Sequence, residues 1–260
     1  MGISLAPGIS LKLHYDPDQL VTRFLLRRRV FEPWLTNFLI LNLRPGQTVL
    51  NIGANVGYFT VLSAKLVGES GSVVAFEPLY ASSLRRNLRL NGLKEQTSSS
   101  RGVSVREVAL SDSPGVVPML EQIDRFHAST LLPSGDLVKQ LGGRSKVRAV
   151  DCRRLDSIVA GIAPNWIVMD AEGSEGRILS GAAEVMAVHR PHIVTAWSSA
   201  ALQAHGTTET EVFQWLTSRG YAMFCSDQQM HKMVLPTSDG WEHTVLATPR
   251  PSELVVPRWA

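Results

Sequence analysis

The sequence predicts an α/β protein built on one open, doubly wound sheet of seven mostly parallel strands, with helices on both faces. Short apolar runs bounded by turn residues alternate with segments of helical periodicity. A glycine-rich turn follows the first of these runs, in "VLNIGANVGYFT" at residues 49–60. The chain has 260 residues, 44% of them hydrophobic, which is enough for one sizeable core with appendages.

Residues 1–45 are expected to form an N-terminal helical extension that caps the domain. Apolar residues recur at helical spacing between residues 16 and 43, and Pro33 divides this stretch into two helices. The main domain is expected over residues 46–250, followed by a C-terminal tail over residues 251–260.

The first half of the domain shows a strand–helix–strand–helix alternation, which predicts a parallel sheet. Gly92 is placed to cap the second of these helices. The expected elements are a strand at 48–52, a helix at 58–67, a strand at 73–77, a helix at 80–92 and a third strand at 103–110.

Residues 113–150 are rich in Gly, Pro and Ser, so we interpret them as an insertion that could act as a lid over the site. Within it, short strands are expected at 115–120 and 146–150. Regular elements are then predicted as helices at 151–159, 173–188 and 208–220, strands at 166–170 and 192–197, and a closing antiparallel pair at 221–226 and 243–248.

No targeting segment or metal site is evident in the sequence. The N-terminus lacks a basic segment followed by an apolar one, and "FLILNL" is too short to span a bilayer. Cys152 and Cys225 have neither CxxC spacing nor a histidine at metal-ligand distance. We therefore expect a soluble, cytoplasmic protein without a bound metal.

The glycine-rich turn predicts a cofactor site at the carboxyl end of the first strand. Its glycines let a ligand approach the backbone, and Glu77 ends the second strand, where a carboxylate can accept hydrogen bonds from ribose hydroxyls. A dinucleotide fingerprint started at Gly53 needs glycine at positions 55 and 58, but Asn55 and Tyr58 stand there. The G-x-N-x-G loop, ending at Gly57, favours a ligand without phosphates, and S-adenosylmethionine fits.

The chain also resembles the FkbM family of S-adenosylmethionine-dependent methyltransferases over roughly residues 30–249. The matching pieces are "FEPWLTNFL", "VLNIGANVGYFT", "VVAFEP", "VALSD", "RRLDSI", "MDAEGSEGRILSGA", "RPHIV", "LTSRGYAMF" and "TVLATP". This resemblance implies a Rossmann-like class I methyltransferase fold and methyl transfer, usually to a hydroxyl oxygen.

The resemblance also implies which residues bind the cofactor. Gly53, Asn55 and Gly57 would cradle its methionine end, and Glu77 would hold the ribose. Val108 and Ala109 would flank the adenine. The further cofactor contacts expected from the same motifs are Tyr58, Phe59, Pro78 and Asp170.

Catalytic groups are expected near the end of the fourth strand, in "MDAEG". We assign Asp170 to the cofactor's amino group or to the substrate hydroxyl. Glu172 is either a second polar contact or an acid favoured by a helix N-terminus. His127, in the insertion, is a catalytic candidate or a surface histidine.

Two further residues have structural alternatives. His192 begins a strand and reads as a packed, hydrogen-bonded structural residue. Trp197 could wall the substrate pocket or belong to the core.

Three positions depart from the pattern that the resemblance implies. Asn51 stands in place of an acid, Val168 in place of a lysine and Ala196 in place of a glutamate. If the three lie together, replacing a charged cluster by neutral residues avoids leaving buried acids unpaired. We hypothesise that they form one compensated change.

The leading interpretation is an O-methyltransferase for a small molecule, natural product or sugar. Two alternatives stay open: a non-catalytic protein that binds S-adenosylmethionine, and a nucleic-acid methyltransferase. The second alternative depends on the net charge of +3 and the pI of about 9.0. The basic run at residues 27–29 reads as a solvated helix face, and the apolar helix at 34–43 could be a homodimer face.

Overall fold

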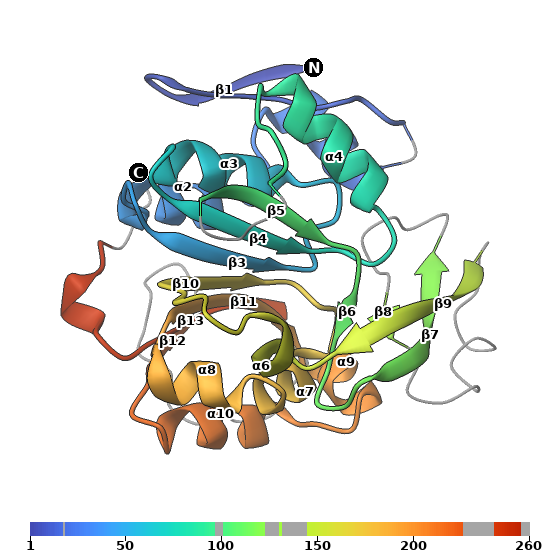
Figure 1. Cartoon of the computed structure of the whole chain (residues 1–260), viewed down its shortest axis with the longest axis vertical. Helices are drawn as coiled ribbons and strands as arrows, with labels where there is room; N and C mark the ends of the chain where they lie inside the picture. Colours follow the sequence, from blue (N-terminus) through green and yellow to red (C-terminus); the bar gives the residue numbers. More distant parts are fainter. Residues whose placement is uncertain (18, 97–100, 123–129, 132–144, 226–241, 256–260) are drawn as a thin grey trace.

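The computed structural model describes residues 1–17, 19–96, 101–122, 130–131, 145–225 and 242–255 (Figure 1). Its central sheet has seven strands in the order β12-β13-β11-β10-β3-β4-β5, so the predicted sheet is confirmed. β13 runs antiparallel to both neighbours, and the pairs from β11 to β5 are parallel. The strands are β3 (Thr48–Ile52), β4 (Ser72–Phe76), β5 (Gly102–Arg106), β10 (Trp166–Met169), β11 (His192–Ser198), β12 (Ala222–Cys225) and β13 (Glu242–Thr248).

Helices cover both faces of this sheet (Figure 1). Because side chains alternate along a strand, Val49 and Leu50 of β3 enter two different core clusters, one on each face. One face carries α2 (Pro33–Asn42), α3 (Tyr58–Val67) and α4 (Ala81–Leu90). The other carries α6 (Leu155–Ile158), α7 (Glu175–Ser180), α8 (Ala183–Val188), α9 (Ser199–Ala204) and α10 (Glu209–Thr217).

The N-terminal extension is not wholly helical. A hairpin of β1 (Gly2–Ala6) and β2 (Ile9–Lys12) precedes α1 (Leu20–Arg28) and α2. Ile3 and Leu11 of this hairpin are buried in the same cluster as α2 and α3. The two predicted helices are present, while the hairpin was missed although Ile3 and Leu11 flank a Pro-Gly turn.

Most apolar residues of α2 pack within the chain, which leaves exposed Leu41 but little else of the helix for the expected dimer face. Trp34 stacks on Phe38 at 5.0 Å between ring centroids, and Phe38 meets Trp166 of β10 at 5.9 Å. Both α2 rings are buried. The helix is apolar because it lies against the sheet, and a homodimer stays a prediction without this helix as its basis.

A second sheet, of order β6-β9-β7-β8, projects from the carboxyl-end edge of the central sheet (Figure 1). Its strands are β6 (Ala109–Leu110), β7 (Gly115–Gln122), β8 (Thr130–Leu131) and β9 (Ser145–Arg153). The predicted strand at 103–110 is therefore divided between two sheets. The predicted helix at 151–159 shortens to α6, because antiparallel pairing with β7 keeps residues 145–152 extended.

The predicted helix at 173–188 is divided into α7 and α8. Gly181 lies between them, and a Cβ there would come within 2.2 Å of the Ser111 carbonyl oxygen. The close approach of the Ser111 segment thus requires glycine at the break.

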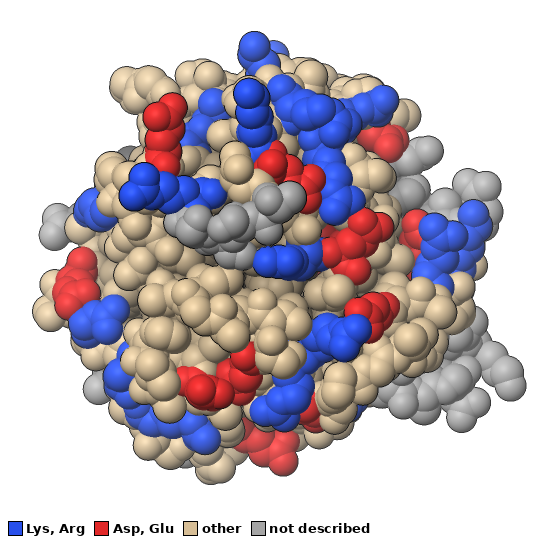
Figure 2. Space-filling model, viewed as in Figure 1, with Lys and Arg blue, Asp and Glu red and all other residues tan. Residues whose placement is uncertain are grey.

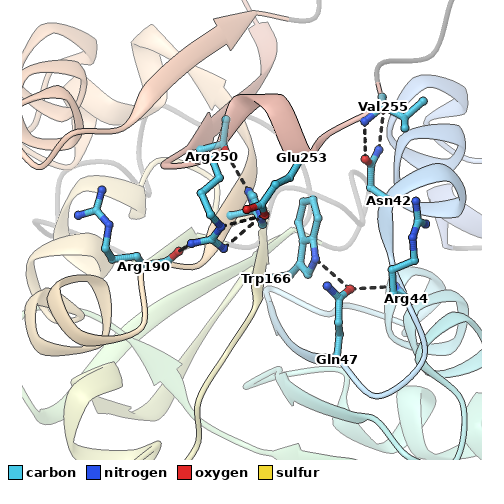
Figure 3. A network of polar contacts seen from close by, with 10 residues as sticks. Asn42, Arg44, Gln47, Trp166, Arg190, Arg250, Glu253 and Val255 are labelled. Atoms are coloured by element: carbon cyan, nitrogen blue, oxygen red, sulfur yellow. Dashed lines mark hydrogen bonds and ion pairs between the residues drawn. The ribbon is translucent and has the colours of Figure 1, made fainter.

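The C-terminal segment, which includes the 3₁₀ turn Pro251–Glu253, lies at the end of the sheet where the parallel strands begin (Figure 3). Asn42 exchanges two hydrogen bonds of 2.7 Å with the backbone of Val255. Arg250 pairs with Glu253 at 2.9 Å. This network ties the C-terminal segment to α2, away from the carboxyl ends of the parallel strands.

Positive side chains gather over α4 on the face that Figure 2 shows. Arg85 of this helix is paired with Glu95 and Glu107 at 3.0 and 2.8 Å. The run at residues 27–29, which ends α1, is exposed, as expected of a solvated helix face. None of the helices in the described residues has both the length and the apolar character needed to span a bilayer.

Candidate cofactor and acceptor site

Two hollows lie side by side at the carboxyl ends of β3, β4 and β10, where an open α/β sheet binds its ligands. They share Gly53, Asn55 and Asp170. We call the first the Glu77 hollow; it encloses about 630 Å³ including its mouth. We call the second the Glu32 hollow; it encloses about 550 Å³ on the same measure. The glycine-rich loop after β3 therefore separates two cavities.

The loop adopts a conformation that its residues suit. Gly53 has φ of +73°, and Asn55, a residue that tolerates the left-handed region, has φ of +49°. A Cβ on Gly53 would lie 1.9 Å from the backbone carbonyl oxygen of Asp170. Gly57 lines neither hollow: it packs on α4, where a Cβ would meet Leu84 at 2.9 Å. Of the two predicted cofactor glycines, the structure brings Gly53 to the site.

Glu77 follows β4 and lines the hollow that bears its name. Its Oε2 accepts a 2.6 Å hydrogen bond from the N–H of Asn55, and Oε1 accepts from the N–H groups of Leu79 and Tyr80 at 2.8 and 2.9 Å. Burial raises the pKa of Glu77, and these three donors oppose the rise. The carboxylate is thus held in place, and Oε2 keeps one acceptor position for a further hydroxyl.

The far wall of the Glu77 hollow is apolar. Val108 and Ala109, which connect β5 to the second sheet, line it together with Pro78. Met119 of β7 and Leu131 of β8 complete the wall, so the described part of the insertion does border the hollow. The sequence predicted a strand at 115–120 within an insertion over the site, but not these two contacts, because pairing in the second sheet brings both residues there.

Asp170 and Glu172 both line the Glu77 hollow, as predicted for the "MDAEG" segment. Asp170 is exposed, and its backbone N–H donates to the carbonyl of Ile52 at 3.0 Å. Glu172 has φ of +50° and precedes the helix, since α7 begins at Glu175. The acid at the helix N-terminus is therefore Glu175, and Glu172 is a polar group of the hollow.

Glu175 was missed by the sequence interpretation. It is 1% exposed, and its Oε1 accepts a 2.9 Å hydrogen bond from the N–H of Ala171, which closes the loop after β10. Within the described residues its Oε2 has no hydrogen-bond partner. Burial, reinforced by the charge of Asp170, raises the pKa of Glu175 to about 7.

Glu175→Gln should stabilise the protein more at pH 8 than at pH 5. The pKa in the folded state lies above the ordinary 4.5, so the protonated carboxyl favours folding below pH 4.5 and this contribution is lost as pH rises to about 7. An uncharged amide avoids a loss on the order of 3 kcal/mol. Urea unfolding of the variant and of the unmodified protein at both pH values measures the change in the free energy of unfolding. Glu32, whose pKa is also raised, contributes equally to the pH dependence of both proteins. An equal effect of the substitution at the two pH values would contradict the assignment.

Tyr58 and Phe59, predicted as cofactor contacts, line the Glu32 hollow instead of the Glu77 hollow. The Tyr58 hydroxyl lies 3.1 Å from Thr36 Oγ1 on α2. Phe31 packs edge-on against Tyr58 at 5.7 Å and tilted against Phe59 at 5.9 Å. These aromatic residues join α3 to the N-terminal extension.

The three departing positions lie together. Val168 pairs with Asn51 across β10 and β3, and both line the Glu32 hollow with Ala196. Asn51 is buried; its Nδ2 donates to the Val168 carbonyl at 3.3 Å, and its Oδ1 accepts from Thr60 Oγ1 at 2.7 Å. This proximity is what the hypothesis of one compensated change requires, and the compensation itself stays a proposal.

The remaining candidates lie elsewhere. His127 is outside the described residues. His192 is buried at the other end of the sheet, where its Nδ1 lies 2.7 Å from Thr248 Oγ1, and burial lowers its pKa to about 4. Trp197 lies in the core and lines neither hollow. The placement thus favours a structural role for both: His192 as a packed, hydrogen-bonded residue and Trp197 as a core residue. Across the described residues, no group of His, Cys, Asp and Glu side chains is arranged to hold a metal.

The polar and apolar groups around the Glu77 hollow fit S-adenosylmethionine. Oε2 of Glu77 can accept from a ribose hydroxyl, and the exposed carboxylate of Asp170 suits an ammonium group. The apolar wall at Val108 and Ala109 suits a purine ring. A pyrophosphate fits less well, because the buried Tyr58 stands where the dinucleotide fingerprint needs glycine.

Comparison with known proteins identifies the family. The methyltransferase FkbM domain matches residues 51–223, which is more than half of the chain. This range includes the loop at Gly53, Glu77 and the segment at Asp170, and it excludes Glu32. Among curated proteins, none matches significantly.

Several solved structures match the chain at low sequence identity. A methyltransferase FkbM from Methylobacillus flagellatus KT is 19% identical with a TM-score of 0.49, covering 78% of this chain and 43% of that one. The precorrin-6y C5,15-methyltransferase of Geobacter metallireducens GS-15 is 13% identical with a TM-score of 0.48, covering 89% and 94%. Aeropyrum pernix fibrillarin, with natively bound S-adenosyl-L-methionine, is 11% identical with a TM-score of 0.44, covering 82% and 71%. The chain spans less than half the length of the Methylobacillus protein.

Proposed function

The chain belongs to the methyltransferase FkbM domain family, and on this premise we propose that it transfers a methyl group from S-adenosylmethionine to a hydroxyl oxygen of a small molecule, natural product or sugar. The observation that carries the proposal is the Glu77 hollow. It combines a fixed carboxylate for a ribose, an apolar wall for a purine and the carboxylate of Asp170 for an ammonium group.

The cofactor supplies an electrophilic methyl group, so the chain has to bind, align and exclude water. Glu77 would hold the ribose of the cofactor, and the loop at Gly53 and the Asp170 carboxylate would hold its amino-acid end. Because Asp170 lines both hollows, the reacting end of the cofactor would lie between them. The Glu32 hollow would then receive the acceptor.

The lining of the Glu32 hollow supports an acceptor without anionic groups. Phe31, Phe59 and Leu35 contribute apolar surface, and no lysine or arginine lines this hollow in the part of the chain that the structure describes. A phosphate or nucleic-acid backbone would need such cations. A hydroxyl on a molecule without phosphate groups fits better.

A methyl-transfer assay tests the proposal. The protein is incubated with S-adenosylmethionine labelled in the methyl group and with a panel of hydroxylated natural products and sugars. We expect a labelled product that resists alkaline hydrolysis, as an ether does. Label on nitrogen or in nucleic acid would contradict the proposed acceptor. Cofactor binding without transfer to any acceptor would support the non-catalytic alternative.

Asp170→Asn should weaken S-adenosylmethionine binding roughly tenfold, because the amide cannot pair with an ammonium charge. Turnover should fall at least as much, whereas thermal stability should change little, since Asp170 is exposed. Calorimetric titration and a thermal melt measure the two quantities. Asp151→Asn, in the second sheet and outside both hollows, serves as the control. Parallel losses of binding and stability would make Asp170 a structural residue.

A further inference from the structure

Glu32 brings a carboxylate to the site from outside residues 51–223, the range that the FkbM domain matches. It is the residue before α2, and its side chain lines the Glu32 hollow with Asn51, Asp170 and Ala196. The N-terminal extension therefore adds a second carboxylate to a cavity in which the end of β10 supplies only Asp170.

The backbone at Glu32 is held in an unfavourable conformation. Its φ of +40° and ψ of +74° are rare for a residue with a long side chain. The conformation is fixed from both sides: the Glu32 carbonyl accepts from the Thr36 N–H at 2.9 Å, and Thr36 Oγ1 donates to the Phe31 carbonyl at 2.6 Å. Such strain persists where the surrounding structure determines it, and it concentrates at functional sites.

The surroundings of Glu32 suit a group that accepts a proton. No residue in the described ranges forms a hydrogen bond with its carboxylate. Burial, followed by the charge of Asp170, raises the pKa of Glu32 to about 7. The other titratable side chains of the hollow are Asp170, after β10, and Tyr58, on α3, whose pKa burial raises, so the phenol stays neutral. At neutral pH a large fraction of Glu32 is ionised and able to take a proton.

Resting on the proposed function, we propose that the Glu32 hollow binds the acceptor and that the Glu32 carboxylate takes the proton of its hydroxyl. The acceptor oxygen forms a bond to the methyl carbon as the carbon–sulfur bond breaks. The bonding electron pair stays on sulfur, which becomes a neutral thioether, and the hydroxyl proton moves to a carboxylate oxygen of Glu32. Asp170 stays with the ammonium group of the cofactor.

Two cofactor analogues test this placement without knowledge of the acceptor. S-adenosylhomocysteine has no charge at the reacting position, whereas sinefungin carries an amine near the place of the transferred methyl group. Glu32→Gln should lower sinefungin affinity roughly tenfold and leave S-adenosylhomocysteine affinity unchanged. In the unmodified protein, the preference for sinefungin should increase from pH 6 to pH 8 as Glu32 ionises, and Glu32→Gln should remove this increase.

Controls separate the outcomes. Glu69→Gln, an exposed carboxylate at the other end of α3, should change neither affinity. Glu32→Asn offers a second uncharged variant, since asparagine tolerates a left-handed backbone. Equal losses for both analogues, or no loss for either, would overturn the role of Glu32. Failure of the unmodified protein to bind either analogue would overturn the proposed function, and this inference with it.

Discussion

Gly53→Ala is expected to abolish measurable cofactor binding and to lower the free energy of unfolding by about 3 kcal/mol or more. The added Cβ would lie 1.9 Å from the carbonyl oxygen of Asp170 and 2.9 Å from its carbonyl carbon. Both are backbone atoms, so β3 and the segment after β10 would have to separate. That separation would displace Gly53 and Asp170, which line both hollows. Urea unfolding and calorimetric titration measure the two losses.

Gly92→Ala is the matched control for this substitution. Gly92 has φ of +71°, close to the +73° of Gly53, and no atom lies within 4 Å of its added Cβ. It should therefore show only the conformational cost of a left-handed alanine, about 1 kcal/mol, with unchanged cofactor affinity. Similar losses in the two variants would mean that the contact with Asp170 is unimportant.

Glu77→Ala is expected to combine a loss of stability with a loss of binding. The substitution leaves the N–H groups of Asn55, Leu79 and Tyr80 without their acceptor, at about 1 kcal/mol each. It also removes the acceptor position for a ribose hydroxyl. We expect the free energy of unfolding to fall by about 3 kcal/mol and cofactor affinity to fall at least roughly tenfold.

Glu77→Gln separates these two effects. Its amide oxygen can keep the two donors of Leu79 and Tyr80, while its NH₂ group then faces the N–H of Asn55. Stability should lie between that of Glu77→Ala and the unmodified protein, and cofactor affinity should still fall. Unchanged affinity in Glu77→Ala would show that the cofactor does not lie in the Glu77 hollow.

The central sheet could be predicted because its strands are short apolar runs bounded by turn residues. Glu77 and Asp170 were predicted for the site because each follows such a strand, and the ends of neighbouring parallel strands meet at one edge. Their order along the chain was therefore enough to bring them together.

The features that the sequence did not predict depend on contacts between segments far apart in the sequence. The second sheet brings Met119 and Leu131 to the hollow through pairing that local patterns do not show. Gly181 ends α7 because the Ser111 segment approaches it. In both cases tertiary packing overrides the local periodicity.

Glu32 was missed for a similar reason. It lies in the matching piece "FEPWLTNFL", but a charged residue before Pro33 is also typical of a helix start. Packing of α2 against α3, with Tyr58 bound to Thr36, is what carries Glu32 to the cavity. Glu175 could have been found, since an acid in the first turn of a helix is a recognisable pattern.

The most direct test of the central claim is calorimetric titration of the purified protein with S-adenosylmethionine, using NAD as the comparison ligand and Glu77→Ala as the control protein. We expect micromolar binding of S-adenosylmethionine, no binding of NAD, and weaker S-adenosylmethionine binding by the variant. Copurified ligand would first be removed by unfolding and refolding. Absence of S-adenosylmethionine binding after that step, or equal binding of NAD, would contradict the assignment of the Glu77 hollow.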